Sequence, residues 1–358
     1  MKKSLIALAA LAATGAFAQS SVTLYGAMDA GYQAIDYKGN KVNGINGNGS
    51  TTSSFNVAGL YDLGGGLKAD FRVENDWNTV GNNANTGAKK ASDGTLANGA
   101  SWGNGEIRTG LAGGFGKVQF GAINNNSLIA NLTGQPFGTA VGSAHGSVVR
   151  SNSAGNAVRN DNSFQYNSPV FNGFSASYLQ SNAQNKANSA NFSSSLGAYL
   201  QNGAKEFSVA YNGNGLDARF TNLKEDKSPS NAGASTKNST LNTLGANYAF
   251  GDAKVFLWNQ TNKSEDGTLN TSGTTVSATY TMGATVLMAQ AGSVKNNVTN
   301  MSSKLTSLGA DYNLSKTVAL YGRYESIKDE GGVIAAAATI DGTGTTRSRT
   351  ALGLRVMY

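Results

Sequence analysis

Few side chains in this chain could carry out chemistry. The 358 residues include one histidine, His145, and no cysteine. The chain therefore cannot build a Cys/His zinc site, a cysteine nucleophile, an iron–sulfur cluster or a disulfide. Ser143 and Ser147 lie two residues to either side of His145, which raises a Ser–His nucleophilic pair as one hypothesis.

A catalytic Ser–His pair needs a third group that orients the imidazole. The stretch 125–160 around His145 contains no Asp or Glu, and serine is frequent enough for chance adjacency. Gly116-Lys117 is followed by Val118 rather than by Ser or Thr, so it does not match a phosphate-binding loop. We therefore expect a protein that is not an enzyme and that holds no cofactor or metal.

The remaining candidates are charged residues that alternate with apolar ones. In 67–74 and in 216–220 every second residue is apolar and the residues between them are charged, and the final stretch 352–358 alternates in the same way. A period of two is typical of a β-strand with one apolar and one polar face.

Short Gly-rich turns and long polar stretches separate these strands in alternation. The turns include 63–66, 113–116 and 212–215, and the longest polar stretches are 78–103 and 125–160. Short turns at one end and long loops at the other are typical of outer-membrane barrels. The pattern predicts sixteen strands, at residues 20–37, 50–62, 66–77, 104–113, 116–124, 161–168, 171–181, 205–212, 216–224, 239–250, 252–262, 272–281, 283–295, 304–314, 316–327 and 345–358.

The first eighteen residues have the pattern of a secretory signal peptide. Lys2 and Lys3 precede an apolar run, and Ala16-Phe17-Ala18 matches the A-x-A cleavage motif. The apolar run is shorter than the ~20 residues of a membrane-spanning helix. We expect residues 1–18 to be removed and residues 19–358 to form one barrel domain.

The composition argues against other classes. Forty-six glycines without proline enrichment exclude collagen. Without Lys2 and Lys3 the 28 basic residues become 26 against 21 acidic ones, and this net charge of about +5 is too thinly spread for a nucleic-acid partner. A soluble sandwich would need about three copies of ~100 residues, yet no change in composition divides the chain. A closed transmembrane barrel explains the alternation better, because it pairs every strand edge.

Five stretches and the aromatic end of the chain resemble the general trimeric porins of Gram-negative outer membranes, especially those of betaproteobacteria. Singly each is a generic hairpin, but their order and spacing are specific. They are 21–26 (Ser-Val-Thr-Leu-Tyr-Gly), 62–69 (Asp-Leu-Gly-Gly-Gly-Leu-Lys-Ala), 110–116 (Gly-Leu-Ala-Gly-Gly-Phe-Gly), 166–169 (Tyr-Asn-Ser-Pro), 173–176 (Gly-Phe-Ser-Ala) and the terminal strand ending in Tyr358.

The resemblance implies an all-β, 16-stranded antiparallel transmembrane barrel that forms a homotrimer, with a third long loop folded inward to narrow the pore. By position this loop is 125–160, and its candidate constriction residues are Gln135, Pro136, Phe137, Gly138, His145, Arg150 and Arg159. The C-terminal strand resembles the signal read by the barrel assembly machinery, with Tyr358 in place of the usual phenylalanine.

The family's usual charge filter is depleted in this sequence. Wall arginines expected from the resemblance fall on Ala58, Ala122 and Gln165, and the loop has no acid to face them. If apolar residues face lipid, the strand alternation turns other charges inward, and rings of fixed charge set ion preference in a narrow pore. These candidates are Asp29, Asp70, Arg72, Glu74, Glu106, Arg108, Asp217, Arg219, Arg323, Glu325, Arg347, Arg349 and Arg355.

The sequence thus predicts an integral outer-membrane porin. It would let small hydrophilic solutes and ions diffuse passively and be weakly anion-preferring or nearly unselective. Expected partners are outer-membrane lipid and lipopolysaccharide. One alternative is a solute-specific channel, for which Tyr25, Tyr166 and Tyr321 are candidate inward aromatics. The other is a surface adhesin or receptor barrel that binds through loops 78–103 and 182–204.

Overall fold

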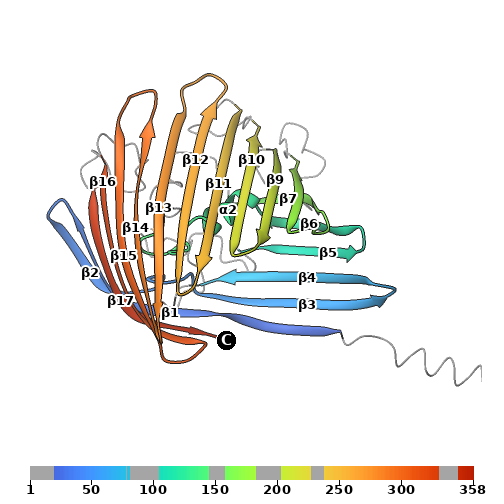
Figure 1. Ribbon diagram of the computed structural model, residues 1–358, viewed down its shortest axis with the longest axis horizontal. Coiled ribbons are helices and arrows are strands. Elements are labelled where there is room, and N and C mark those ends of the chain that lie inside the picture. Colours follow the sequence, from blue (N-terminus) through green and yellow to red (C-terminus); the bar gives the residue numbers. More distant parts are fainter. Residues whose placement is uncertain are drawn as a thin grey trace, which may run out of the picture.

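The protein is one antiparallel β-sheet closed on itself (Figure 1). The computed structural model describes residues 20–77, 79–80, 105–144, 158–182, 203–226, 238–329 and 346–358. The expected signal peptide, 1–18, and the candidates His145 and Arg150 lie outside these residues. Within them, no helix is long and apolar enough to cross a membrane.

Sixteen strands form the ring, as the alternation predicts. In order they are β1 (Ser21–Tyr37), β3 (Ser54–Gly64), β4 (Leu67–Asp76), β5 (Ile107–Gly113), β6 (Gly116–Asn124), β7 (Arg159–Asn167), β8 (Phe174–Ser181), β9 (Ala204–Gly213), β10 (Leu216–Glu225), β11 (Ser239–Phe250), β12 (Ala253–Ser264), β13 (Asn270–Met282), β14 (Thr285–Asn296), β15 (Ser302–Asn313), β16 (Val318–Asp329) and β17 (Arg347–Met357). Each pairs with the next.

The first strand closes the ring because its two halves pair with different partners. Residues 21–27 pair with β3, and residues 27–36 pair with β17. At the seam the backbone amide of Gly26 donates to the carbonyl of Tyr358 at 3.0 Å, and the Tyr358 hydroxyl donates to the Ser54 carbonyl at 3.1 Å. Tyr358 thus ties the last strand to both β1 and β3, and no strand edge is left open at this seam.

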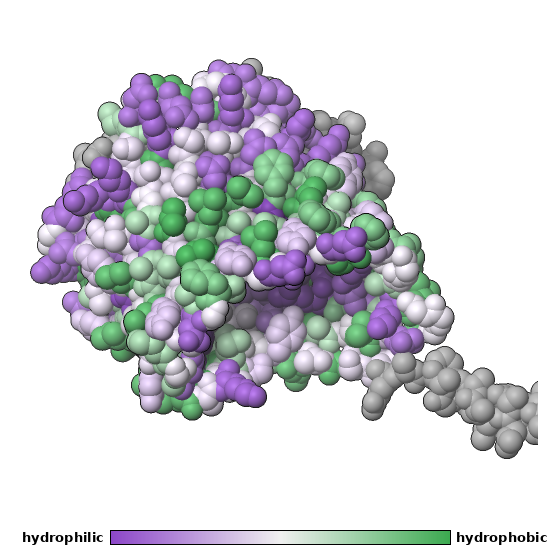
Figure 2. All heavy atoms as spheres, in the orientation of Figure 1, coloured by the Kyte–Doolittle hydropathy of each residue, from purple (hydrophilic) through white to green (hydrophobic). Residues whose placement is uncertain are grey.

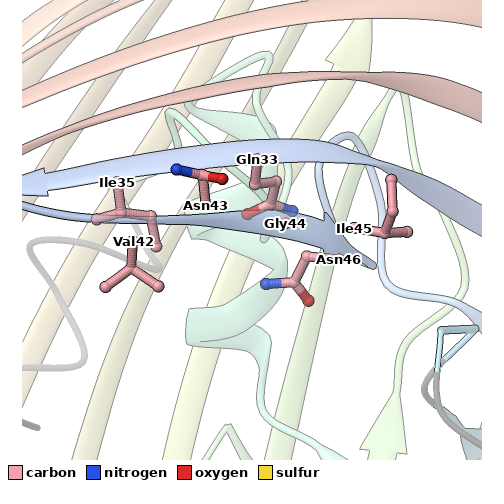
Figure 3. A pocket seen from close by; sticks show the side chains of 7 residues that line it. All are labelled: Gln33, Ile35, Val42, Asn43, Gly44, Ile45 and Asn46. Atoms are coloured by element: carbon pink, nitrogen blue, oxygen red, sulfur yellow. The ribbon is translucent and has the colours of Figure 1, made fainter.

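One strand was not predicted. Residues 38–49 were expected to be a connection, but β2 (Asn40–Asn46) folds back on the second half of β1. The reversal occurs at Lys38 and Gly39, whose φ angles are 51° and 94°, and consecutive positive φ values suit a tight hairpin. The hairpin extends beyond the ring, and Gln33, Ile35 and residues 42–46 line a shallow hollow on it (Figure 3).

Burial alternates along the strands as the period of two requires. In β16, Leu320 and Tyr324 are exposed while Tyr321, Arg323 and Glu325 are buried. The exposed face is apolar and the buried face is largely polar, which is the reverse of a soluble protein. In a closed barrel the exposed apolar face meets lipid, so the polar face lines the interior.

The long connection after β6 begins with a helix, α2 (Asn126–Thr133), and continues to Ala144 within the described residues. Figure 1 shows α2 beside β10 and β11, and their residues are in contact. This segment, 126–144, packs against the interior face of the wall.

Candidate functional site

The structure places the candidate charges on the interior face. The last strand pairs with the first, and Asp29 lies directly opposite Arg355 in the β1–β17 pair. Asp217 and Arg219 share the inner face of β10 with buried Thr221. Tyr25 and Tyr321 also face inward, whereas Tyr166 was wrongly expected there, because its neighbour Gln165 takes the buried face.

Charges on β4, β5 and β6 form one interior cluster. Arg72 lies 3.0 Å from Glu106 and 3.3 Å from Glu74. Asp70 accepts hydrogen bonds from Arg108 and from Lys117, the latter at 3.0 Å. Arg108 also lies 3.4 Å from Glu106, which joins the two groups of charges. We call the residues of this group the first charge cluster: Asp70, Arg72 and Glu74 of β4, Glu106 directly before β5, Arg108 of β5 and Lys117 of β6.

A second charge cluster lies across the seam on β1, β15, β16 and β17. Arg323 and Arg355 both approach Asp311, at 2.7 and 3.5 Å. The buried Asp29 accepts the Tyr321 hydroxyl at 2.6 Å, as well as the backbone amides of Ser50 and Thr51 at 2.7 Å each. The guanidinium groups of Arg323 and Arg355 also donate to the Ser50 hydroxyl, at 3.2 and 3.1 Å.

Glu325 is a fully buried acid of the second cluster. Its side chain is 0% exposed, and it pairs with Arg347 at 3.2 Å and Arg349 at 2.6 Å. It also accepts the backbone amide of Gly142 at 3.0 Å. One carboxylate therefore holds two arginines and one point of the 126–144 segment.

The cations of these pairs are more exposed than the acids that hold them. This is true in eight of nine ion pairs between described residues, and the exception is Arg323–Asp311. Arg349 is 20% exposed and Lys117 is 30% exposed, against 0% for Glu325 and 14% for Asp70. The interior therefore presents positive groups to water while the balancing carboxylates lie behind them.

The beginning of the 126–144 segment is attached to the wall by a buried acid. Glu206 on β9 is fully buried and accepts the backbone amides of Asn126 and Ser127, the latter at 2.7 Å. These amides are at the first turn of α2, where unpaired N–H groups and the helix dipole favour a negative charge. Arg219 donates to the Asn126 side chain at 2.7 Å, so β10 holds the same point.

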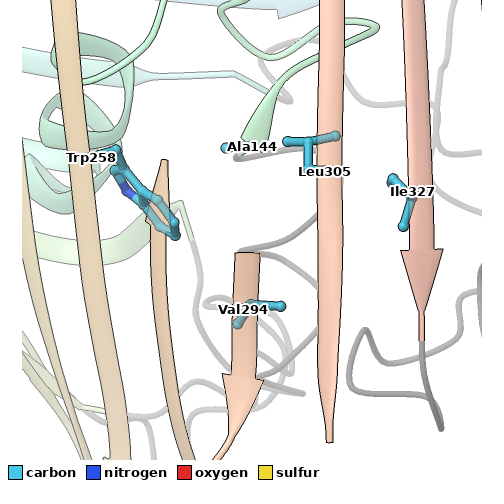
Figure 4. Packing of buried hydrophobic residues seen from close by; sticks show 5 residues of the cluster. All are labelled: Ala144, Trp258, Val294, Leu305 and Ile327. Atoms are coloured by element: carbon cyan, nitrogen blue, oxygen red, sulfur yellow. The ribbon is translucent and has the colours of Figure 1, made fainter. Parts of the chain in front are cut away.

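The far end of the segment sits in an apolar part of the interior wall. Ala144 packs with Trp258 and Val294, and Leu305 and Ile327 complete the cluster (Figure 4). Gln290 and Ser307 both donate to the carbonyl of Gly142, at 3.0 and 2.9 Å. The segment thus contacts the wall from β9 to β16.

The middle of the segment contains the predicted Gln-Pro-Phe-Gly element. Gln135 is buried and stabilises the turn. Its side-chain amide donates to the Gly138 carbonyl and the Ser143 hydroxyl, and its side-chain oxygen accepts from the Ala144 backbone amide at 2.7 Å. Phe137 is buried, with the Arg323 guanidinium 6.0 Å from its ring centre.

The remaining described candidates of the loop are Pro136, Arg159 and Gly138. Pro136 borders a hollow lined by residues of β11–β14. Arg159, at the start of β7, donates to the Asn124 side chain at 3.0 Å. Gly138 has a φ of 58°, a conformation that glycine adopts at no steric cost.

The charged residues of the interior that were missed in the sequence include Glu206, Asp311 and Lys117. Their strand alternation could have found them, because each shares its face with buried polar neighbours. In β9, for example, Phe207 and Val209 are exposed, which places Glu206 and Ser208 on the inner face. The alternation could not have shown that Glu206 binds the start of α2, 79 or 80 residues away in the chain.

Comparison with known proteins identifies the family. The family model described as Gram-negative porin matches residues 4–332. The chain belongs to this family. It is 32% identical to outer membrane porin protein 32 of Delftia acidovorans over 92% of this chain and 90% of that protein. It is 35% identical to major outer membrane protein P.IB of Neisseria gonorrhoeae over 49% of this chain and 47% of that protein.

Solved porin structures share the fold. The anion-selective porin from Comamonas acidovorans superposes with a TM-score of 0.75 at 22% identity, covering 95% of this chain and all of that one. Outer-membrane expressed OmpT of Vibrio cholerae gives a TM-score of 0.62 at 16% identity, covering 96% of this chain and all of that one. Family, relatives and barrel together show an outer-membrane porin channel integral to the outer membrane.

Proposed function

We propose that this porin is a passive, weakly anion-preferring pore for small hydrophilic solutes and ions. The observation that carries the proposal is the unequal exposure of the interior ion pairs, in which carboxylates are buried behind arginines and Lys117. A permeating anion then approaches positive groups more closely than negative ones, and rings of fixed charge set preference in this way. The Comamonas porin of similar fold is described as anion-selective, which agrees with this sign.

We further propose that the 126–144 segment is the constriction. It contacts the interior face of the wall from β9 to β16, and it contains no acid. The first charge cluster lies on the opposite arc, β4–β6, so the open lumen would run between the segment and this cluster. Ions passing the segment would meet arginines of both clusters, and the segment itself would add no negative charge.

The pore would work as a homotrimer in the outer membrane and would carry out no chemical step. Family membership supports the trimer, and the alternation of exposed apolar residues around the barrel leaves surface for both lipid and neighbouring copies. Tyr358, by its place at the end of the seam strand, is the proposed mark for the barrel assembly machinery. Residues 1–18 would direct export and be cleaved.

Single-channel recording in a planar bilayer tests the proposal. Three equal conductance steps and a reversal potential shifted toward chloride in a KCl gradient are the expected results. A cation-preferring reversal potential would contradict the proposed charge arrangement. A saturable current with one solute would favour a specific channel, and a folded barrel that binds a ligand without conducting would favour a receptor.

A further inference from the structure

Six lysines form a belt on the outer face of the barrel, at the ends of the strands that lead into the long loops. All six are exposed and alternate with buried interior residues of the same strands. None has an ion pair or side-chain hydrogen bond with another described residue. We call them the lysine belt: Lys205, Lys224, Lys263, Lys295, Lys304 and Lys328.

Two pairs of these lysines lie directly opposite each other on neighbouring strands. Lys205 of β9 faces Lys224 of β10, and Lys304 of β15 faces Lys328 of β16. Like charges at directly opposed positions destabilise a sheet, because their Cβ atoms are only about 5 Å apart. An anion bound between two such lysines would remove this repulsion.

The belt covers one arc of the barrel only. It runs over β9–β16, where Thr240 lies between Lys224 and Lys263 in the register of β10, β11 and β12. Within the described residues of β3–β8 and β17, no lysine or arginine alternates to the outer face. The acids adjacent to belt lysines in sequence, Glu206, Glu225 and Asp329, alternate to the interior. Asp226 and Glu265 lie two residues further toward the loops, so the outer face keeps an excess of positive charge at the belt.

From the belt toward the short turns, the outward-facing residues change first from lysines to neutral polar residues and then to apolar residues. The residue two positions nearer the short turn carries a hydroxyl or amide on five of the six strands: Asn222, Thr261, Ser293, Thr306 and Ser326. Two positions further, the residues are mostly apolar, as with Leu308 and Tyr324. Figure 2 shows the hydrophilic residues gathered at the loop end above a band richer in hydrophobic ones.

We propose that the lysine belt binds the phosphate groups of the glycolipids that form the outer leaflet of the outer membrane. The long loops of such barrels are extracellular, so the belt lies at the height of outer-leaflet headgroups. Phosphates would neutralise the opposed lysine pairs, and the hydroxyl and amide side chains below would contact sugar hydroxyls. The arc β9–β16 is then the lipid-facing side of the protein.

Native mass spectrometry of the full-length folded protein in zwitterionic detergent tests this proposal. The probes are bisphosphorylated lipid A, its dephosphorylated form and inorganic phosphate. The variants are K205Q/K224Q and K304Q/K328Q. The matched control, K68Q/K316Q, removes two exposed lysines beside the short turns.

The phosphorylated lipid should bind at least 10-fold more tightly than the dephosphorylated one. Each belt variant should lose about 10- to 30-fold in affinity for it, since a lysine near an anionic lipid surface contributes roughly 5-fold. The control should bind like the wild type. Equal binding of the two lipids, an equal loss in the control, or equally tight binding of inorganic phosphate would overturn the proposal.

Thermal stability gives a readout that does not depend on lipid counting. Without lipid, the belt variants should melt at the same temperature as the wild type or higher, because a repulsive pair has been removed. Added lipid should stabilise the wild type more than the variants, and equal stabilisation would contradict lysine-bound phosphate. The inference rests on the outer-membrane location and not on ion preference, so unchanged single-channel selectivity in the belt variants separates the two proposals.

Discussion

Replacing Arg349 by glutamine should lower the anion preference of the pore by a factor that can be worked out. Arg349 is 20% exposed and pairs with the buried Glu325, which keeps Arg347 and the Gly142 amide as partners after the change. The variant therefore loses one water-facing positive charge without leaving the carboxylate unpaired. The Arg347–Glu325 pair and the hydrogen bond from the Gly142 amide remain, so the barrel should fold normally.

The expected size follows from Coulomb's law with screening. A unit charge about 6 Å from a permeating ion contributes roughly 0.7 kcal/mol in water. Screening at about 0.1 M salt, where the Debye length is about 10 Å, reduces this to roughly 0.4 kcal/mol. Anions and cations shift in opposite directions, so the permeability ratio changes by about 0.8 kcal/mol, or about 4-fold. At about 1 M salt the same charge should change the ratio only about 1.4-fold.

Reversal potentials in KCl gradients centred near these two concentrations measure the effect. The chloride-to-potassium permeability ratio should fall in the variant, and the change should shrink at high salt. An unchanged ratio at low salt would show that Arg349 does not face the ion path. A higher ratio would refute the reasoning that exposed cations outweigh buried acids. Lys254→Gln, an interior lysine close to the Phe256 ring, provides a charge-matched comparison outside both clusters.

Two further variants test the contacts that attach the 126–144 segment to the barrel wall. Glu206→Gln should weaken the hydrogen bonds from the Asn126 and Ser127 amides, because a neutral acceptor replaces a carboxylate at a helix N-terminus. We expect the attachment of the segment to the wall to lose about 1–2 kcal/mol of free energy and the open-channel current to become noisier. Gly245→Ala should displace α2, because an added Cβ would overlap the Ala130 carbonyl; we expect an altered unit conductance, and an unchanged one would place α2 outside the ion path.

The barrel could be predicted from the sequence because the rule that builds it is local. Each strand shows its period of two within about ten residues, as in 216–220, and short Gly turns separate the strands in pairs. Strand β2 (Asn40–Asn46) was missed because its two apolar residues, Val42 and Ile45, do not follow a period of two and both its faces are exposed. A strand without a buried face needs no alternation of apolar and polar residues, so the sequence pattern does not reveal it.

The interior site was predictable in part for the same reason. Alternation gives the face of a residue, so the inward direction of Arg323 and Glu325 followed from the sequence. It gives neither the partner across the barrel nor the exposure of each member of a pair. Glu325 and Gly142 are 183 residues apart in the chain, and only the closed fold brings them to 3.0 Å.

The two charge clusters differ in how they are linked to the 126–144 segment, and this difference makes a prediction. Glu325 holds both arginines and the segment, so Glu325→Gln should raise anion preference and also disturb the segment, seen as increased current noise. In the first cluster, the contacts described for Arg72 are with Glu74 and Glu106, and none of them is with residues 126–144.

Arg72→Gln should therefore lower anion preference while leaving current noise and unit conductance close to those of the wild type. Removing Arg72 leaves Glu106 near Arg108 and hydrogen-bonded to the Asn124 amide at 3.2 Å, so the wall itself should stay ordered. Recording both variants in the same bilayer separates charge from constriction. If Arg72→Gln raised the noise as much as Glu325→Gln does, the segment would depend on both clusters, and the assignment of a separate mechanical role to Glu325 would be wrong.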